Sequence, residues 1–89
     1  MVCLIYQIKL NVSAEKFLYR LRDQKLVERL REAIRKLRQN PWPTGSTKIV
    51  GSAAKYRVRV GDYRIVYEVH DRILVVVVIT IGHRREVYR

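Results

Sequence analysis

Residues 55–67 have the sequence KYRVRVGDYRIVY, and this stretch decides the fold. Apolar or aromatic residues alternate with basic residues through most of it, which predicts β-structure, because successive side chains of a strand point to opposite faces. The pair Gly61-Asp62 predicts a tight turn between two strands, since glycine tolerates the positive φ that hairpin turns require. A two-residue turn places Val60 opposite Tyr63 and fixes the register of the whole hairpin.

This register gathers three guanidinium groups on one face of the hairpin. Arg59 is opposite Arg64, and Arg57 shares the face because it lies two residues before Arg59. Further along, Lys55 is opposite Glu68. Like charges that face each other destabilise a sheet, so we expect another molecule to supply an anion there. A nucleic acid would supply it, and so would an acidic protein partner.

The overall charge points in the same direction. The chain has 89 residues with 19 Lys and Arg against 8 Asp and Glu, a formal net charge of +11. A folded domain with this charge attracts polyanions, so nucleic acid, a ribosome, an anionic membrane and an acidic protein are all candidate partners. The length and the apolar content of 48% predict a single folded domain over residues 1–89.

Several classes of site are disfavoured. Cys3 is the single cysteine, so neither an intramolecular disulfide nor a cysteine-based metal site is expected. The carboxylates are scattered without metal-ligand spacing, and the chain has no glycine-rich phosphate loop, so we expect no metal and no cofactor. The apolar run of residues 73–79 is too short to span a bilayer, and no signal peptide is recognisable at the start. We therefore expect a soluble cytoplasmic protein.

The first half of the chain predicts one strand and two helices. Apolar and β-branched residues from Val2 to Lys9 predict the strand. Helical spacing of apolar residues over 14–39 predicts two consecutive helices in an antiparallel hairpin, with Ser13 and Asp23 as N-caps. Asn40-Pro41 ends the second helix, because proline cannot continue it.

The second half of the chain predicts the rest of the sheet. A short strand is expected around Lys48–Val50, followed by the hairpin of residues 55–69. The last strand, residues 73–81, is apolar on both faces and is therefore expected at the covered centre of the sheet. The predicted class is α+β with the order β-α-α-β-β-β, an antiparallel or mixed sheet with a helical hairpin packed on one face.

The second helix presents a basic face. It carries Lys25, Arg29, Arg31, Arg35, Lys36 and Arg38, interleaved with Glu28 and Glu32. The acids have the i, i+3 and i, i+4 spacing that supports ion pairs with the cations. A solvated surface explains this pattern, and a docking surface for phosphate backbones explains it as well.

The aromatic residues are expected to pack rather than to bind a ligand. Tyr56, Tyr63 and Tyr67 alternate onto the face of the hairpin opposite the arginines, which predicts a core position. Trp42 lies between two prolines and is expected to cover an edge of the core. His70 is expected to face solvent.

The C-terminal residues 82–89, GHRREVYR, form a second concentration of charge. Tyr88 has a flat ring suited to stacking on an unpaired base, and His83 can change charge near neutral pH. We expect Arg84 or Arg85 to face the hairpin arginines. Such groups suit metal-free RNA cleavage, in which a 2′-hydroxyl attacks the neighbouring phosphate and fixed positive charge stabilises the transition state.

Together these motifs resemble the RelE branch of the RelE/ParE toxin superfamily. The resemblance rests on Asn40-Pro41, on KIVG at residues 48–51, on YRVRVGDYRIVY at residues 56–67 and on GHRREVY at residues 82–88. It implies a ribosome-dependent endonuclease that cuts mRNA in the A site and is held inactive by a RelB-like acidic antitoxin. ParE-like members share this fold but poison DNA gyrase, and an RNA-binding module without catalysis is a third reading.

The resemblance also implies roles for individual residues. The paired basic residues of the family before the hairpin turn fall on Arg57 and Arg59, and its arginine after the turn falls on Arg64. Its C-terminal arginine falls on Arg84, and its stacking tyrosine on Tyr88. The best-known members have lysines at the paired positions, and an arginine does not give up its proton as a lysine can.

The acid/base role is therefore assigned to His83 as a hypothesis, because it is the one group able to change charge near neutral pH that the tail motif places close to the hairpin arginines. Lys55 is the substitute. The predicted catalytic set is Arg57, Arg59, Arg64, His83, Arg84 and Tyr88. The predicted RNA- and ribosome-binding residues are Lys55, Arg85, Arg89, Arg29, Arg35 and Lys36. The arginines after the turn and in the tail, with the terminal tyrosine, favour the nuclease over the gyrase inhibitor.

Overall fold

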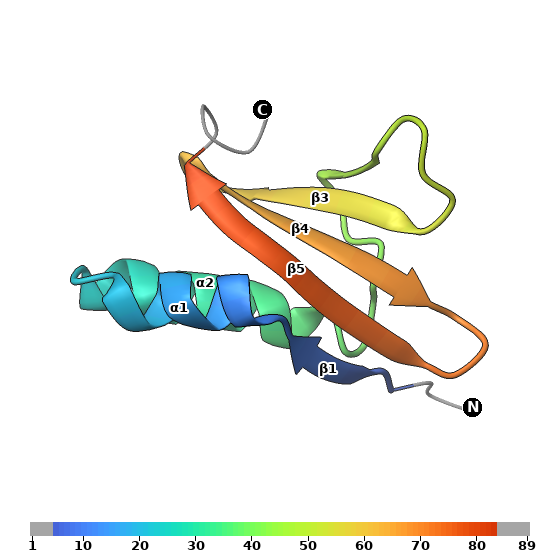
Figure 1. Cartoon of the computed structure of the whole chain (residues 1–89), viewed down its shortest axis with the longest axis horizontal. Helices are drawn as coiled ribbons and strands as arrows, with labels where there is room; N and C mark the ends of the chain where they lie inside the picture. The colour runs from blue at the N-terminus through green and yellow to red at the C-terminus, as the bar shows by residue number, and fades with distance from the viewer. Residues whose placement is uncertain (1–4, 84–89) are drawn as a thin grey trace.

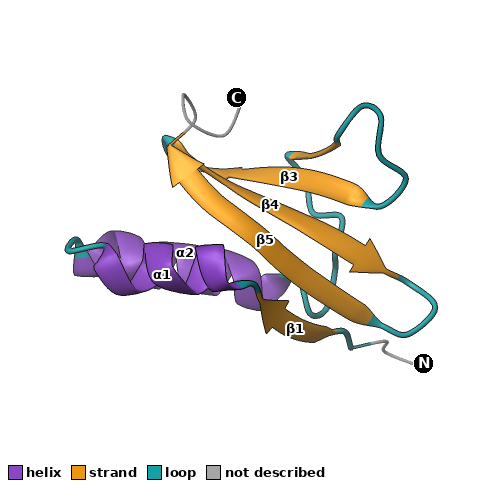
Figure 2. Ribbon diagram, in the orientation of Figure 1, coloured by secondary structure: helices purple, strands orange, loops and turns teal. Residues whose placement is uncertain are grey.

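The computed structural model describes residues 5–83, which form two layers. Its elements are β1 (Gln7–Leu10), α1 (Val12–Arg20), α2 (Gln24–Lys36), β2 (Ser46–Lys48), β3 (Lys55–Val60), β4 (Tyr63–His70) and β5 (Val75–His83). The strands make one five-stranded sheet in the order β1-β5-β4-β3-β2. Both helices lie on the same face of this sheet, as Figures 1 and 2 show. The predicted α+β fold is confirmed.

The sheet is mixed because its first and last strands run in the same direction. β1 pairs with β5 in parallel, and every other pairing is antiparallel. β5 therefore lies inside the sheet between β1 and β4, as its apolar sequence predicts. Four strands follow the helices, as the four predicted strand segments require, although the predicted order β-α-α-β-β-β counts only three. The short strand expected around Lys48–Val50 lies slightly earlier, at Ser46–Lys48, and forms the edge of the sheet.

One of the two predicted helix N-caps is confirmed. Asp23 caps α2, since its Oδ1 accepts a hydrogen bond from the backbone N–H of Leu26 at 3.2 Å. The prediction of Ser13 as the cap of α1 is wrong. Asn11 is the cap and accepts from the N–H of Val12 at 3.0 Å, while the Ser13 hydroxyl lies 3.1 Å from that of Thr80 on β5.

The core lies between the helices and the inner face of the sheet. Its fully buried large side chains are Tyr67, Leu30, Leu37, Ile65, Val76 and Val78. Burial of each such side chain contributes about 1.5–3 kcal/mol relative to leaving it exposed. Within residues 5–83, no helix is long and apolar enough to span a membrane.

An aromatic cluster closes the core beneath the segment that follows α2. The Tyr67 hydroxyl donates to the Pro41 carbonyl at 2.7 Å, and its ring stacks on Tyr56 with centroids 6.0 Å apart. Trp42, which is 43% exposed, packs edge-on against Tyr6 and Tyr56. The expected core positions of Tyr56 and Tyr67 and the edge position of Trp42 are thereby confirmed.

Two tyrosines of this cluster predict a loss of stability in alkaline solution. The hydrogen bond to Asp71, assisted by burial, raises the pKa of Tyr6 to about 12, and burial raises the pKa of Tyr67 to about 12. Since both folded values exceed the ordinary 10.0, this stabilisation is complete below pH 10 and is lost as the pH rises toward 12. We expect Tm to fall over that interval, with a smaller fall in Tyr6→Phe. A Tm that is constant over the interval would contradict the assignment.

Candidate functional site

The β3–β4 hairpin has the register that its sequence predicts. Arg59 pairs with Arg64, Arg57 with Val66, and Lys55 with Glu68. The turn is formed by Gly61, whose φ is +60°, and Asp62. A positive φ at this position is readily adopted by glycine, which explains why the turn can be so short.

Three arginines line one small pocket on the sheet. Arg57 and Arg59 reach it from β3 and Arg64 from β4, and Gly45 and Thr47 complete a hollow of about 150 Å³. Thr47 belongs to β2 and pairs with Arg57. Arg59 is held in place by its own turn, because its Nε donates to the Gly61 carbonyl at 2.9 Å. We call this hollow the arginine pocket.

The arginine pocket faces away from the helices. On β3 and β4 the residues that alternate with the arginines, Val58 and Ile65, are buried in the core against the helices. The arginines therefore lie on the outer face of the sheet, which is the face without helices in Figure 2. Arg57 and Arg64 are only partly exposed and Arg59 is exposed, so a molecule on this face can contact the pocket.

His83 does not lie with the arginines, and the predicted placement beside them is wrong. It pairs with Tyr63 at the end of β5, and the two rings meet edge-on with centroids 5.5 Å apart. Tyr63 in turn packs against Phe17 of α1, so His83 is on the helix side of the sheet. The arginine pocket is on the other side.

A β-bulge in β5 is the physical reason for this difference. The register shifts between Val66 and Tyr67, so that Tyr67 pairs with Val78 but Val66 pairs with Thr80. One extra residue in a strand reverses which face the following side chains occupy. Without the bulge, simple alternation would have placed His83 on the outer face. The apolar run before it conceals this irregularity in the sequence.

The other predicted residues fall into three groups. Lys55 lies on the outer face two residues from Arg57, and its cross-strand neighbour Glu68 contacts His70 at 3.3 Å. On α2, Lys36 is exposed, Arg35 pairs with Glu32, and the guanidinium of Arg29 lies beside Gly61 at the hairpin turn. The tail residues Arg84, Arg85, Tyr88 and Arg89 lie outside the described residues, and their roles stay predictions.

Two features of the site were not anticipated from the sequence. Thr47 enters the arginine pocket because β2 begins at Ser46, two residues before the predicted strand. Arg29 reaches the turn from a helix, and that approach depends on tertiary packing that local patterns do not encode. In residues 5–83, no group of three His, Cys, Asp or Glu side chains could hold a metal ion.

The chain matches a known protein family over most of its length. Residues 8–88 match the model of the ParE toxin of the type II toxin–antitoxin system parDE. The chain belongs to the RelE/ParE toxin superfamily. The match covers nearly the whole chain, including the hairpin that carries the arginine pocket, so the protein is a toxin of a type II toxin–antitoxin system.

Individual relatives of the toxin agree with this family. Toxin RelG of Mycobacterium tuberculosis is 26% identical over 84 residues, which are 94% of this chain and 97% of RelG. RelE in the archaeal RelE–RelB complex from Pyrococcus horikoshii superposes with a TM-score of 0.80 at 27% identity, covering 90% of this chain and 96% of that one. The isolated E. coli RelE toxin gives 0.76 at 29% identity, with 93% and 90% covered.

Proposed function

We propose that this toxin is an endoribonuclease that cleaves mRNA in the A site of the ribosome, with no metal ion taking part. The observation that supports this most is the arginine pocket, in which Arg57, Arg59 and Arg64 converge from two strands on a face that the helices leave open. In the proposed reaction, the 2′-hydroxyl loses its proton and attacks the adjacent phosphorus, the bond to the 5′-oxygen breaks, and the leaving 5′-oxygen takes up a proton. The place of action would be the cytoplasm.

The arginines suit the charge that develops in this reaction. A phosphorane-like transition state carries more negative charge on its non-bridging oxygens than the ground state does, and fixed donors aimed at those oxygens lower the barrier. The planar guanidinium matches two phosphate oxygens at once and keeps its charge at any working pH. Arg59 is already oriented by its hydrogen bond to Gly61, so little reorganisation is needed there.

Proton transfer requires a different side chain, since arginine does not titrate. The position of His83 on the helix side of the sheet favours another side chain for this role. Lys55 lies on the outer face two residues from Arg57, a separation of roughly 7 Å along a strand. We assign the removal of the 2′-hydroxyl proton to Lys55. The tail residues Arg84 and Tyr88 are further predicted contacts to the RNA.

The substitution Lys55→Arg tests this assignment with little change in charge or size. We expect the cleavage rate at neutral pH to fall by about 100-fold or more, because arginine preserves the electrostatic attraction but cannot accept a proton. A variant that cleaves as fast as the wild type from pH 6 to 8 would reduce Lys55 to a phosphate contact.

The antitoxin is the second proposed partner. Relatives of this toxin have been crystallised with RelB, among them RelE of P. horikoshii and of E. coli. A toxin with a net charge of +11 suits an acidic antitoxin, whose association would be steered by charge and slowed by salt. We therefore propose a RelB-like acidic antitoxin as the inhibitor.

A second function is favoured by one specific observation, the ParE description of the matching family model. ParE-like toxins poison DNA gyrase, and the same basic surface would then meet an acidic protein instead of RNA. The presence of arginines where well-known RelE members have lysines makes this alternative worth measuring directly.

One experiment separates the two functions. Primer extension on a defined mRNA, with and without programmed ribosomes, is run beside a gyrase supercoiling assay with the same purified toxin. Cuts at the A-site codon that require the ribosome support the proposed nuclease. Intact mRNA together with inhibited supercoiling would overturn it in favour of the gyrase inhibitor.

A further inference from the structure

Thr47 brings a hydroxyl group into the arginine pocket from the edge strand β2. It is directly opposite Arg57 in the pairing of β2 with β3. Its neighbour Ser46 is opposite Val58, which is buried against the helices, so Thr47 lies on the outer face together with the arginines. Thr47 is exposed, and its hydroxyl is therefore open to a molecule bound in the pocket.

The lining of the arginine pocket is rich in hydrogen-bond donors and poor in acceptors. A guanidinium has five N–H donors and no acceptor, so the three arginines can hold phosphate oxygens but cannot take a proton. A threonine hydroxyl has one donor and two acceptor lone pairs. Among the described residues of this lining, Thr47 is therefore the side chain that can accept the proton of a ribose 2′-hydroxyl.

Lys55, the proposed proton acceptor, lies beside this lining. It precedes Arg57 by two residues on the outer face, which makes it the diagonal neighbour of Thr47. Diagonal neighbours of an antiparallel pair are roughly 7–8 Å apart, within reach of a long side chain. The backbone of Lys55 is fixed at this place, because its N–H donates to Ser52 Oγ at 3.2 Å and its carbonyl accepts from the N–H of Ile49 at 2.9 Å. Thr47 thus adjoins both the arginines and the lysine.

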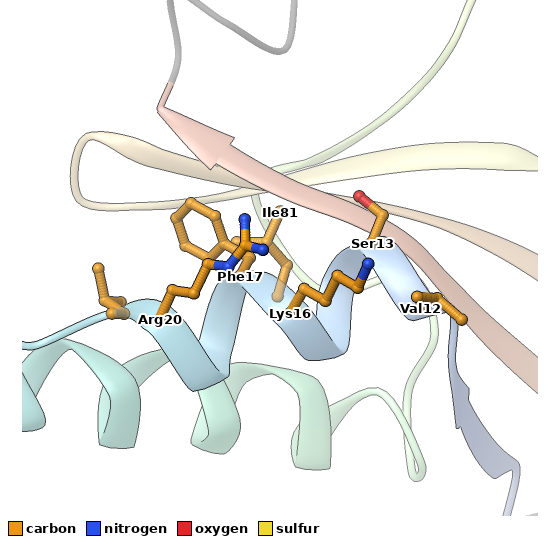
Figure 3. Close-up of a pocket in the computed structure, with 7 residues that line it drawn as sticks. Val12, Ser13, Lys16, Phe17, Arg20 and Ile81 are labelled. Atoms are coloured by element: carbon orange, nitrogen blue, oxygen red, sulfur yellow. The ribbon is translucent and has the colours of Figure 1, made fainter.

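A larger hollow on the helix side of the sheet is less suited to the same chemistry. It lies between α1 and β5, has a volume of about 640 Å³, and is drawn in Figure 3. Its lining has one arginine, Arg20, instead of three. The hydroxyl of Ser13 in this lining shares a hydrogen bond with that of Thr80 at 3.1 Å. The arginine pocket is therefore the better place for a phosphate and the 2′-hydroxyl next to it.

We propose that Thr47 relays the proton of the 2′-hydroxyl to Lys55. The proposal rests on the nuclease site of the proposed function. The 2′-hydroxyl gives its proton to Thr47 Oγ1, and the proton that Thr47 carried passes to the neutral amine of Lys55. The 2′-oxygen bonds to phosphorus, the bond to the 5′-oxygen breaks, and that oxygen takes up a proton from solvent. Thr47 ends the step as a hydroxyl and Lys55 as an ammonium.

The substitution Thr47→Val tests the relay, because valine keeps the branched shape suited to a strand and lacks the hydroxyl. We expect single-turnover cleavage on saturating programmed ribosomes to slow by about 100-fold, while Thr47→Ser, which keeps the hydroxyl, stays within about threefold of the wild type. Thr44→Val, the same change at an exposed threonine outside this lining, is expected to cleave like the wild type. Affinity for the programmed ribosome should change by less than about threefold in all three variants, since no charge is altered.

A double variant distinguishes a relay from two separate contacts. If one proton passes through both side chains, Thr47→Val combined with Lys55→Arg is as slow as either single variant, about 100-fold below the wild type. Effects that multiply to about 10,000-fold would overturn the relay. Wild-type rates in Thr47→Val would also overturn it and leave the nuclease standing. A wild-type toxin that cuts no mRNA overturns the nuclease and the relay together.

Discussion

Replacement of Arg64 by alanine is expected to lower the rate of the proposed A-site mRNA cleavage by about 100- to 1000-fold. Arg64 comes from β4, pairs with Arg59 and lines the arginine pocket. Its loss removes a donor whose interaction strengthens as the phosphorane forms, and the effect should appear in the rate of the bound complex. Single-turnover cleavage on saturating programmed ribosomes measures that rate.

Two control variants make the Arg64 result specific. Arg64→Lys keeps the positive charge but loses the bidentate geometry, and it is expected to recover only part of the rate. Arg72→Ala removes an exposed arginine in the β4–β5 turn and is expected to cleave like the wild type. Equal rates in Arg64→Ala and Arg72→Ala would show that the pocket does not stabilise the transition state.

Replacement of Tyr67 by alanine is expected to destabilise the fold by about 3–5 kcal/mol. The Tyr67 side chain is fully buried, stacks on Tyr56 and donates to the Pro41 carbonyl. Truncation leaves a cavity beneath the segment after α2 and an unpaired buried carbonyl. Urea denaturation of the purified toxin gives the change in the free energy of unfolding.

The matched variant Tyr67→Phe divides this effect between packing and the hydrogen bond. It keeps the ring and removes only the hydroxyl, so we expect a loss of about 1 kcal/mol. Tyr19→Ala, which truncates a tyrosine that is 91% exposed, should change stability little. A Tyr67→Ala variant as stable as Tyr19→Ala would mean that the aromatic cluster does not contribute to the core.

The hairpin could be predicted residue by residue because two local rules act together there. The alternation over residues 55–60 sets the faces, and the two-residue turn at Gly61-Asp62 sets the register. The parallel pairing of β1 with β5 could not be predicted in the same way. It joins Gln7 to Val75, and no local pattern encodes a partner so distant in the chain.

The arginines of the candidate site could be predicted from the same local rules, whereas the position of His83 could not. The three arginines of the pocket follow from the hairpin register alone. The face of the sheet on which His83 lies depends on how many residues of β5 separate it from the middle of the strand. The single bulge in β5 adds one residue and moves His83 to the opposite face. Such an irregularity costs little in a strand where both faces are apolar, because valine and isoleucine tolerate either side.

The parallel β1–β5 pair has a consequence for the synthesis of this toxin. Of the strands in residues 5–83, β5 is made last, yet it occupies the sheet position between β1 and β4. While β5 is still inside the ribosome, β1 has no strand to join and the helices have no complete sheet to cover. The arginine hairpin can form early, but the sheet that supports it closes only after β5 has emerged. The arginine pocket thus gains its supporting core only after β5 has been made, so synthesis of β5 sets the moment at which the toxin can become active.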